Sequence, residues 1–395
     1  WAVTIGTLPF LLLFFSQFSL ISPLTNALAI PWVSGVVTPL TILALIVPWD
    51  PLLYLANALM TPLLAFLQWS AALPVAIWHA PVPSPLVFGL AILGALWWLM
   101  PAGLPGRWLA LFLCLPLVLP KIDSVPAGQA RIDVLDVGQG LAVVVRTHRH
   151  VLLYDTGPYY SSEADAGVRV IVPYLRAIGV ERLDAMVVTH RDTDHSGGAL
   201  SVLESMPVGW VADAPDTRFA DAVPGVRSKT CQAGRDWTWD GVRFEFLHPS
   251  SQAAAKNLAS NHQSCVLQVS VGDKRMLLTS DIELADEQQM VAQGMLPSQI
   301  LLVPHHGSGT SSGDALLNAV QPEIAIVPVG YRNRYRHPKP EVMAGYEARK
   351  MRIYRTDTDG MVQVDLPAMT VSAYRRVHQR YWMDQPSGAV AQDEQ

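Results

Sequence analysis

Apolar and polar residues are distributed very unevenly along this chain. The segment from Trp1 to Pro120 is almost continuously apolar, and only Asp50 and Arg107 in it carry a formal charge. A segment of this length with so few charges cannot form the surface of a water-soluble domain, so it predicts membrane-embedded helices. The longest apolar runs predict spans at Phe10–Ile21, Val33–Val47, Leu52–Leu73, Leu86–Met100 and Trp108–Leu119.

Several of these spans are shorter than the roughly 20 residues that a helix needs to cross a bilayer. Prolines such as Pro31, Pro39 and Pro62 are expected to interrupt them. Broken helices are tolerated at membrane depth where the freed backbone lines a cavity, so the pattern favours a channel or transporter module. The alternative is a set of proline-kinked anchor helices. The chain opens in apolar sequence without a charged leader or cleavage site, so we interpret it as a fragment of a larger membrane protein.

Beyond Pro120 the pattern changes to short apolar runs between polar turns. We expect a linker over residues 121–130, a globular domain over residues 131–383 and a disordered tail over residues 384–395. The runs predict strands at Arg131–Leu135, Leu141–Arg146, Val151–Tyr154, Ala185–Val188, Arg243–Leu247, Val266–Val271, Arg275–Leu278, Ile300–Val303, Ile324–Val327, Met361–Val364 and Thr370–Tyr374. Helices are predicted at Val168–Ile178, Gly198–Ser205, Glu283–Gln293, Asp314–Val320 and after Pro340. Sheets with helices outside them make this an α/β sandwich.

Composition adds two constraints. The net charge of −5 argues against a broad basic surface of the kind that many nucleic-acid-binding proteins carry. Three cysteines are too few for a disulfide scaffold, and Cys114 lies in an apolar segment as a small lipid-facing or packing residue. Cys231 and Cys265 could pair if the domain faces an oxidising compartment, which the sequence leaves open.

The most specific chemical signal is a motif that follows the apolar run at 186–188. Four potential metal ligands lie within six residues, namely His190, Asp192, Asp194 and His195, and Ser-Gly-Gly follows at once. A strand end that delivers several ligands into one loop is typical of sites for one or two metal ions that activate water. The alternative is a polar loop of helix-capping aspartates beside two surface histidines.

Other predicted apolar strands are also followed by potential metal ligands. Asp155 follows one predicted strand, Asp281 follows another, and the pair His305 and His306 follows a third. A single aspartate at a strand end is more often a turn or cap residue. Three such strand ends together with the motif predict one shared metal site.

A local basic patch covers residues 331–339, in which four cations are interleaved with two tyrosines. This composition suits phosphate contact and base stacking. The candidate DNA-binding residues are Arg332, Arg334, Tyr335, Arg336 and Lys339. The alternative is a solvated loop between a strand and a helix.

Five segments, LDVGQG, LLYDTG, THRDTDHSGG, LLTSD and VPHHGS, resemble in this order the metallo-β-lactamase superfamily. More narrowly they resemble the ComEC family of membrane DNA-uptake proteins of natural competence. Residues 19–39 are similar to the end of that family's membrane competence domain. The resemblance implies a metallo-β-lactamase-like αββα sandwich after a transmembrane domain at residues 1–120. It also implies a multi-pass protein of the bacterial inner membrane with its nuclease domain on the periplasmic side.

The resemblance further implies roles for individual residues. His190 and Asp192 would hold one metal ion, Asp194 and His195 the other, and Asp281 would bridge the two. His306 is favoured over His305 to close the second site, because it directly precedes a glycine. Asp155 and Asp192 are candidates to accept a proton, and Asn261 and Ser264 resemble the residues usual at their positions in the family. These roles are carried over on the following residues: His190, Asp192, Asp194, His195, Asp281, His305, His306, Asp155, Asn261 and Ser264.

Two departures from the superfamily pattern change the expected metal. Asp192 stands where many superfamily hydrolases have histidine, and the usual third histidine of the first site has no clear equivalent. His262 is a weak candidate for it. Replacing imidazole by carboxylate favours oxygen-seeking ions, so the expected cofactors are two divalent ions, Mn²⁺ or Zn²⁺.

The expected function is therefore DNA uptake. The membrane part would form part of a channel for single-stranded DNA, and the α/β domain would be a metal-dependent nuclease that degrades the non-transported strand. The expected partners are single-stranded DNA, membrane lipid and other proteins of the competence machinery. Two alternatives remain: a membrane-tethered metallohydrolase of small phosphoesters or lactones, and a non-catalytic domain that guides DNA.

Overall fold

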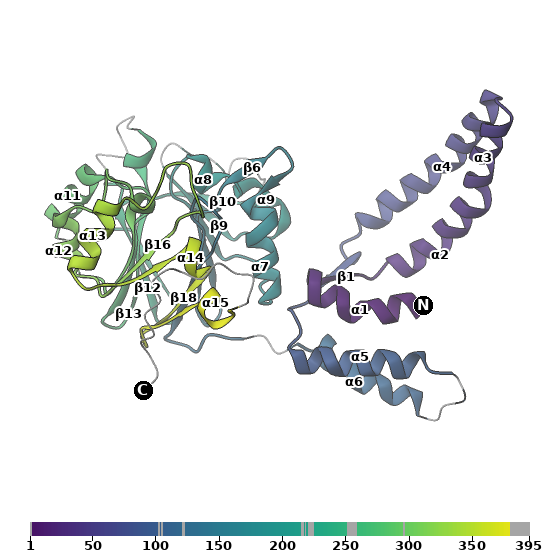
Figure 1. Cartoon of the computed structure of the whole chain (residues 1–395), viewed down its shortest axis with the longest axis horizontal. Helices are drawn as coiled ribbons and strands as arrows, with labels where there is room; N and C mark the ends of the chain where they lie inside the picture. The colour runs from purple at the N-terminus through teal and green to yellow at the C-terminus, as the bar shows by residue number, and fades with distance from the viewer. Residues whose placement is uncertain are drawn as a thin grey trace. The chain divides into compact units, whose positions relative to one another are not determined.

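The chain forms two compact units, one of residues 1–123 with 176–179 and the other of residues 124–175 with 180–395 (Figure 1). The computed structural model describes residues 2–101, 103, 106–120, 123–214, 217, 219, 225–250, 259–294 and 297–379. The expected tail after residue 383 lies outside the described residues, as does the start of the expected linker.

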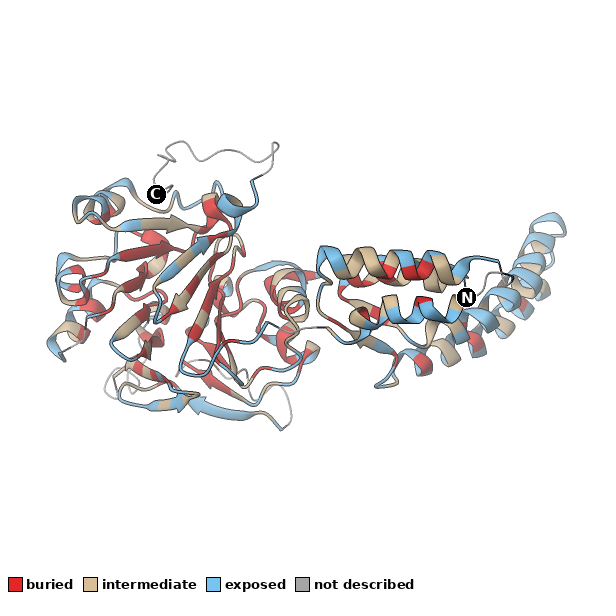
Figure 2. Cartoon of the chain, turned by 90° about the horizontal axis from the view of Figure 1, so that it is seen from below, coloured by how far each residue is buried: buried red, intermediate tan, exposed pale blue. Residues whose placement is uncertain are grey.

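The first unit is helical. Its helices are α1 (Ala2–Phe15), α2 (Ser22–Trp32), α3 (Thr38–Ile46), α4 (Asp50–Ala71), α5 (Pro85–Leu99) and α6 (Ala110–Val118), with a π-helical turn at Val33–Val37 and a 3₁₀ turn at Arg107–Leu109. A short antiparallel pair joins β1 (Gln17–Ser19) to β2 (Ile77–His79). Two segments, Ser22–Ile46 and α4, are long and apolar enough to cross a membrane, and only 6% and 11% of their most apolar windows are buried. Figure 2 shows most of these helical surfaces as exposed or intermediate.

Two expectations for this unit were wrong. The span expected at Phe10–Ile21 does not exist, because α1 ends at Phe15 and β1 follows before α2 begins at Ser22. Pro31 and Pro62 also do not interrupt helices, because they lie inside α2 and α4, whereas Pro48 does lie between α3 and α4. Between Pro31 and α3 the chain forms the π-helical turn, whose wider hydrogen-bonding pattern keeps the segment helical despite a missing donor.

The second unit is an αββα sandwich. One sheet has the order β10-β9-β8-β5-β4-β3-β18-β19, and the other has the order β11-β12-β13-β14-β15-β16-β17. The strands of the first sheet are β3 (Ala130–Val134), β4 (Val143–Arg146), β5 (Val151–Tyr154), β8 (Ala185–Val188), β9 (Trp210–Asp213), β10 (Arg227–Thr230), β18 (Val362–Leu366) and β19 (Thr370–Ala373). Those of the second are β11 (Asp236–Trp239), β12 (Val242–His248), β13 (Val266–Val271), β14 (Lys274–Leu278), β15 (Ile300–Leu302), β16 (Ile324–Val327) and β17 (Arg352–Arg355).

Helices cover the outer faces of both sheets (Figure 1). On the first sheet these are α7 (Val172–Ala177), which continues the π-helical turn Gly167–Ile171, and α9 (Ala199–Ser205); on the second they are α11 (Leu284–Ala292), α12 (Asp314–Val320) and α13 (Pro340–Ala348). The remaining short elements are β6 (Tyr159–Ser161), β7 (Ala164–Asp165), α8 (Thr193–Ser196), α14 (Thr356–Asp359) and α15 (Tyr374–Val377).

The apolar pattern explains why these strands lie where they do. The parallel strands β8 and β16 are buried on both faces, so all their residues are apolar. The antiparallel strand β12 alternates instead, with Val242, Phe244 and Phe246 facing the other sheet and charged residues between them. The main core lies between the two sheets.

The expected strands at Val151–Tyr154, Ala185–Val188, Val266–Val271 and Ile324–Val327 have the observed bounds. Strands at the sheet edges, such as β10 and β17, were not predicted from the sequence. All four residues of β10, Arg-Ser-Lys-Thr, are exposed, so neither alternation nor an apolar run marks this edge strand.

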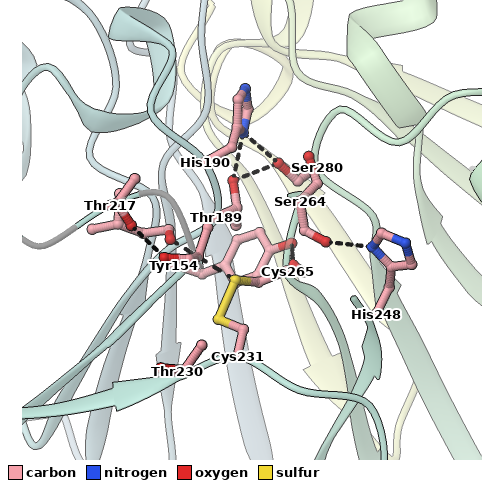
Figure 3. Close-up of a disulfide and its surroundings, with 12 residues drawn as sticks. Tyr154, Thr189, His190, Thr217, Thr230, Cys231, His248, Ser264, Cys265 and Ser280 are labelled. Atoms are coloured by element: carbon pink, nitrogen blue, oxygen red, sulfur yellow. Dashed lines mark hydrogen bonds between the residues drawn. A yellow bond between two sulfur atoms is a disulfide. The ribbon is translucent and has the colours of Figure 1, made fainter. Parts of the chain in front are cut away.

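A disulfide joins the two sheets. Cys231, just after β10, is bonded to Cys265, just before β13, with 5.8 Å between their Cα atoms (Figure 3). Both cysteines are fully buried in the core between the sheets. The covalent bond therefore ties the ends of two strands from different sheets.

Candidate metal centre

Four chain segments meet at one edge of the sandwich. The loop after β8 carries His190 to His195 and runs into α8, and Asp155 directly follows β5, the parallel neighbour of β8. Asp281 follows β14, and His306 lies in the 3₁₀ turn Pro304–Gly307 after the parallel neighbour β15. Because parallel strands end at the same edge of a sheet, the topology brings these side chains together.

Four side chains form a compact cluster of ligand atoms. One atom each from Asp194, His195, Asp281 and His306 lies within 4.8 Å of all the others. The Asp281 carboxylate lies between the imidazoles, with Oδ1 3.2 Å from His195 Nε2 and Oδ2 3.5 Å from His306 Nε2. Asp194 Oδ2 is 3.6 Å from His306 Nε2. Two carboxylates and two imidazoles that converge in this way provide a donor set for a divalent ion.

Hydrogen bonds from behind orient both imidazoles of the cluster. His195 Nδ1 lies 2.7 Å from Asp155 Oδ2, and His306 Nδ1 lies 2.6 Å from the carbonyl oxygen of Pro328. These acceptors fix the proton on Nδ1 and leave each Nε2 free to face the cluster. Metal-binding histidines are held by the same arrangement.

His190 extends the cluster. Its ring centroid lies 4.2 Å from that of His195, and its Nδ1 is 3.0 Å from Thr189 Oγ1. Its Nε2 is buried, has no hydrogen-bond partner among the described residues, and lies 3.8 Å from Asp192 Oδ2. A buried imidazole nitrogen without a partner is costly unless an ion or a water occupies the space before it, so His190 and Asp192 are candidates to hold such a group beside the cluster.

The charges of the cluster are strongly coupled. Burial favours the neutral form of His306, but the Asp281 carboxylate outweighs it and raises the pKa of His306 to about 9. Burial also opposes ionisation of Asp281, yet the imidazoles of His195 and His306 hold its pKa well below the usual range. Burial and the neighbouring His195 lower the pKa of His190 to about 3, so this ring is neutral and its nitrogen can act as a ligand.

Asp155 is a positioning residue. It is fully buried behind His195 and also accepts hydrogen bonds from the backbone nitrogen and Oγ1 of Thr189, both at 2.8 Å. The role of proton acceptor that the sequence suggested for Asp155 conflicts with this placement, because the carboxylate has no access to solvent. Asp192 has an exposed side chain and can still fill that role.

The two adjacent histidines of the turn Pro304–Gly307 both approach Asp281 Oδ2, but His306 is buried and His305 is partly exposed. Only His306 belongs to the four-residue cluster. His305 lies on the solvent side, with Nε2 3.7 Å from Asp281 Oδ2 and Nδ1 3.2 Å from Thr310 Oγ1. Both residues have φ near +50°, a backbone conformation that non-glycine residues rarely adopt and that often marks functional sites.

The segment Asn261–Ser264 lies to one side of the cluster. His262 Nδ1 is 2.8 Å from Asp286 Oδ2, so this ring is turned toward a structural carboxylate and does not join the ligand group. Asn261 Nδ2 donates to Glu283 Oε1 at 3.3 Å. Ser264 is fully buried, and its Oγ has no hydrogen-bond partner among the described residues.

Two residues that the sequence analysis missed support the site. Thr189 Oγ1 lies 2.5 Å from Ser280 Oγ, and the two hydroxyls bridge the sheets directly behind His190 (Figure 3). Their only signal in the sequence is that each immediately precedes a predicted ligand, His190 and Asp281. The backbone nitrogen of Cys265 donates to the Thr189 carbonyl at 3.1 Å, so the disulfide anchors this support.

The turn at Gly140 requires glycine. Its φ is +141°, and a Cβ built on it would lie 2.3 Å from the Asp194 carbonyl oxygen. The neighbouring Leu141 donates its backbone N–H to the same oxygen at 3.1 Å. The loop of residues 136–140 is therefore pressed against the ligand-bearing segment.

The basic loop, defined as Tyr331–Lys339, lies beside the ligand-bearing turn. The backbone nitrogen of Lys339 donates to the Gly307 carbonyl at 2.9 Å. The Arg332 guanidinium lies 5.0 Å from the ring centroid of Tyr331, and that of Arg334 lies 4.7 Å from the ring centroid of Tyr335. Arg336 is exposed. The loop thus presents the cations and rings that the sequence singled out close to the cluster.

Replacing Asp155 by asparagine is expected to weaken metal binding by about 10- to 100-fold, the usual effect of removing a carboxylate that orients a metal-binding histidine. The amide would no longer fix the His195 tautomer. Titration of the metal-free protein with Mn²⁺ or Zn²⁺ measures this. Asp236→Asn, at an exposed ion pair with Arg243, is the control. An unchanged affinity in Asp155→Asn would contradict the orienting role.

Comparison with known proteins gives two matching family models. Residues 1–105 match the Competence protein model, and residues 135–331 match the model of the Metallo-beta-lactamase superfamily. The chain is 40% identical to Competence protein ComA of Neisseria gonorrhoeae over 389 residues, which cover 98% of this chain and 54% of that protein. It is 34% identical to Recombination protein 2 of Haemophilus influenzae over 256 residues, which cover 65% of this chain and 31% of that protein.

The chain thus spans between about a third and about a half of the length of the curated relatives it matches. Among solved structures, the metallo-beta-lactamase fold protein YhfI of Bacillus subtilis is similar with a TM-score of 0.41 and 12% identity. That similarity covers 59% of this chain and 99% of YhfI.

Proposed function

This chain belongs to the competence protein family and carries a metallo-β-lactamase domain, and we propose that this domain is a metal-dependent nuclease that hydrolyses phosphodiester bonds in DNA. The family is membrane-associated and takes part in DNA uptake, and members of the superfamily are typically metal-dependent hydrolases. The observation that carries the proposal is the cluster of Asp194, His195, Asp281 and His306, backed by Asp155 and Pro328.

The side chains divide the catalytic work. Asp194, His195, Asp281 and His306 would hold one divalent ion, and His190, Asp192 and the shared Asp281 would hold the other. Bound there, two such ions supply Lewis-acid activation of water and of the phosphate. The exposed Asp192 carboxylate can accept the proton of the attacking water.

Substrate binding is assigned to the basic loop. Arg332, Arg334, Arg336 and Lys339 provide the charge that neutralises phosphates, and Tyr335 provides a ring for base stacking. These groups would hold a DNA strand with one phosphate at the metal ions. Asn261 and Ser264 remain candidates for contacts to the substrate beside the metal ions.

We assign the first unit to the membrane, as part of a multi-pass channel for single-stranded DNA. The exposed apolar surfaces of Ser22–Ile46 and α4 support this assignment, because such surfaces require lipid or protein around them. The nuclease unit would lie on the periplasmic side and degrade the strand that is not transported. The Cys231–Cys265 disulfide supports that location, because disulfides persist in oxidising compartments.

A cleavage assay on the full chain in detergent tests the nuclease proposal. Wild type is expected to degrade single-stranded DNA with added Mn²⁺ but not with a chelator, and Asp194→Ala is expected to lose the activity. Asp273→Ala, at an exposed turn far along the chain from the motif, is the control. No cleavage by folded, metal-loaded wild type would contradict the proposal and favour a hydrolase of small phosphoesters. No bound metal at all would favour a DNA guide.

A further inference from the structure

The basic loop forms one rim beside the ligand-bearing segments. The hairpin β6–β7, together with Arg169, forms a second rim beside α8. Its two tyrosines are large exposed aromatic residues, with Tyr159 53% and Tyr160 43% accessible. The Arg169 guanidinium lies 5.8 Å from the ring centroid of Tyr160. This rim therefore combines exposed rings with a cation, as the basic loop does.

The hairpin is held firmly against the ligand-bearing segment. The start of β6 lies so close to the end of α8 that a Cβ built on Gly197, the residue after that helix, would be 2.2 Å from the Tyr159 nitrogen. The Tyr160 hydroxyl donates to the Val137 carbonyl at 2.8 Å. Strand β6 thus lies next to α8, which carries Asp194 and His195, and its Tyr160 ring is fixed by the hydrogen bond to Val137.

The loop that anchors this hairpin also anchors the basic loop. Two residues after Val137, the side chain of Gln139 accepts a hydrogen bond from the Gly330 nitrogen at 3.2 Å. Gly330 directly precedes the basic loop, and a Cβ built on it would lie 2.4 Å from the Gln139 nitrogen. The segment 137–139 therefore contacts both the β6–β7 rim and the residue that precedes the basic loop, and the two rims carry the same kind of side chains.

A series of ring contacts leads from Tyr335 of the basic loop to the cluster. The Tyr335 ring stacks on His337, with centroids 5.8 Å apart and planes 13° apart. His337 lies 6.1 Å from His305, which is itself next to His306. Within the loop, Asn333 bonds to the backbone of His337 in both directions, at 2.7 and 2.9 Å, so the loop holds its shape.

We propose that the two rims form one track that binds an extended single strand on both sides of the bond to be cleaved. The β6–β7 rim, through Tyr159, Tyr160 and Arg169, would take the nucleotides on one side, and the basic loop those on the other. The inference rests on the proposed function and specifies its substrate. Bases stack on aromatic rings only when they are unpaired, so a duplex cannot use the tyrosines of either rim.

Such a track predicts dependence on substrate length. A strand of about 12 nucleotides, within the usual range of single-strand binding sites, would contact both rims. Bis(p-nitrophenyl) phosphate would contact only the metal centre. Substitutions on the β6–β7 rim should therefore raise KM for the oligonucleotide and leave its kcat unchanged. The rate of hydrolysis of bis(p-nitrophenyl) phosphate should also be unchanged.

The test compares Tyr159→Ser and Arg169→Gln with Tyr159→Phe in the full chain, using a 12-nucleotide single strand and bis(p-nitrophenyl) phosphate. KM for the single strand is expected to rise about tenfold in Tyr159→Ser and to be restored in Tyr159→Phe, since stacking needs only a ring. Tyr374→Ser, at an equally exposed tyrosine on α15, is the matched control.

The outcomes separate the two proposals. Unchanged KM for the single strand in Tyr159→Ser and Arg169→Gln overturns the track and leaves the nuclease intact. An equal loss of activity on bis(p-nitrophenyl) phosphate also overturns the track, because the substitutions would then act on the metal centre itself. Failure of wild type to cleave either substrate with bound metal overturns the nuclease and the track together.

Discussion

Replacing Asp281 by asparagine is expected to lower DNA cleavage by about a thousandfold or more. Bound metal ions contribute several kcal/mol of charge stabilisation in the transition state, and each 1.36 kcal/mol corresponds to a factor of ten in rate. Asp281 faces His195 at 3.2 Å and His306 at 3.5 Å, so its loss removes the carboxylate at the middle of the cluster. The bound metal should fall below two ions per chain.

The measurement combines metal analysis of the purified protein with cleavage rates at saturating Mn²⁺. Asp281→Asn keeps the shape of the side chain, and thermal unfolding shows whether the fold survives. Asp273→Asn controls for the loss of a carboxylate. Asp273 lies on the exposed turn before β14, the strand that Asp281 follows. If Asp281→Asn still binds two ions and cleaves DNA at a near-normal rate, the Asp281 carboxylate does not hold both ions. The metal site would then lie elsewhere.

Much of this centre could be predicted because its chemistry is local in the sequence. The ligands of the motif lie within six residues, and Asp281 and His306 each follow an apolar strand whose end is easy to recognise. Several buried strands of one domain rarely end in metal-binding side chains unless those side chains share a site. Agreement between strand pattern and ligand chemistry is therefore informative even without a structure.

The supporting residues could not be predicted in the same way. Thr189 and Ser280 meet across the two sheets, and Pro328 contributes only a carbonyl oxygen. Their roles depend on the packing of strands far apart in the sequence, which no local pattern records. The direction of His262 is a similar case, because only the fold places Asp286 within 2.8 Å of its ring.

The helical unit shows the limit of proline as a signal. In water, a proline inside an apolar segment usually ends the helix, which is why we expected interruptions at Pro31 and Pro62. Both lie within helices. After Pro31 a π-helical turn at Val33–Val37 keeps the segment helical, and prolines are tolerated in the same way inside membrane helices. The spans expected at Leu52–Leu73, Leu86–Met100 and Trp108–Leu119 lie within two residues of the observed helices, so proline misled the prediction only where the helix continues through it.

Removal of the Cys231–Cys265 disulfide is expected to destabilise the nuclease unit by roughly 2–4 kcal/mol, since it closes a loop with a sequence separation of 34 residues. For a unit of this size, that corresponds to a fall in Tm of about 10 °C. Metal affinity should fall as well, because Cys265 donates to the Thr189 carbonyl and accepts from the Tyr154 hydroxyl at 2.6 Å. Thr189 in turn supports both Asp155 and His190.

The double variant Cys231→Ala/Cys265→Ala tests how the disulfide supports the metal centre without the use of a reductant. A reductant reaches the buried sulfurs slowly and adds incidental effects. Thermal unfolding and Mn²⁺ titration are compared with wild type and with Cys114→Ala, which removes the unpaired cysteine of the helical unit. The expected result is a lower Tm and a weaker affinity in the double variant alone. If Tm falls while affinity is unchanged, the disulfide stabilises the sandwich without supporting the centre. If neither changes, the two sheets are held by their apolar core and the covalent tie is dispensable.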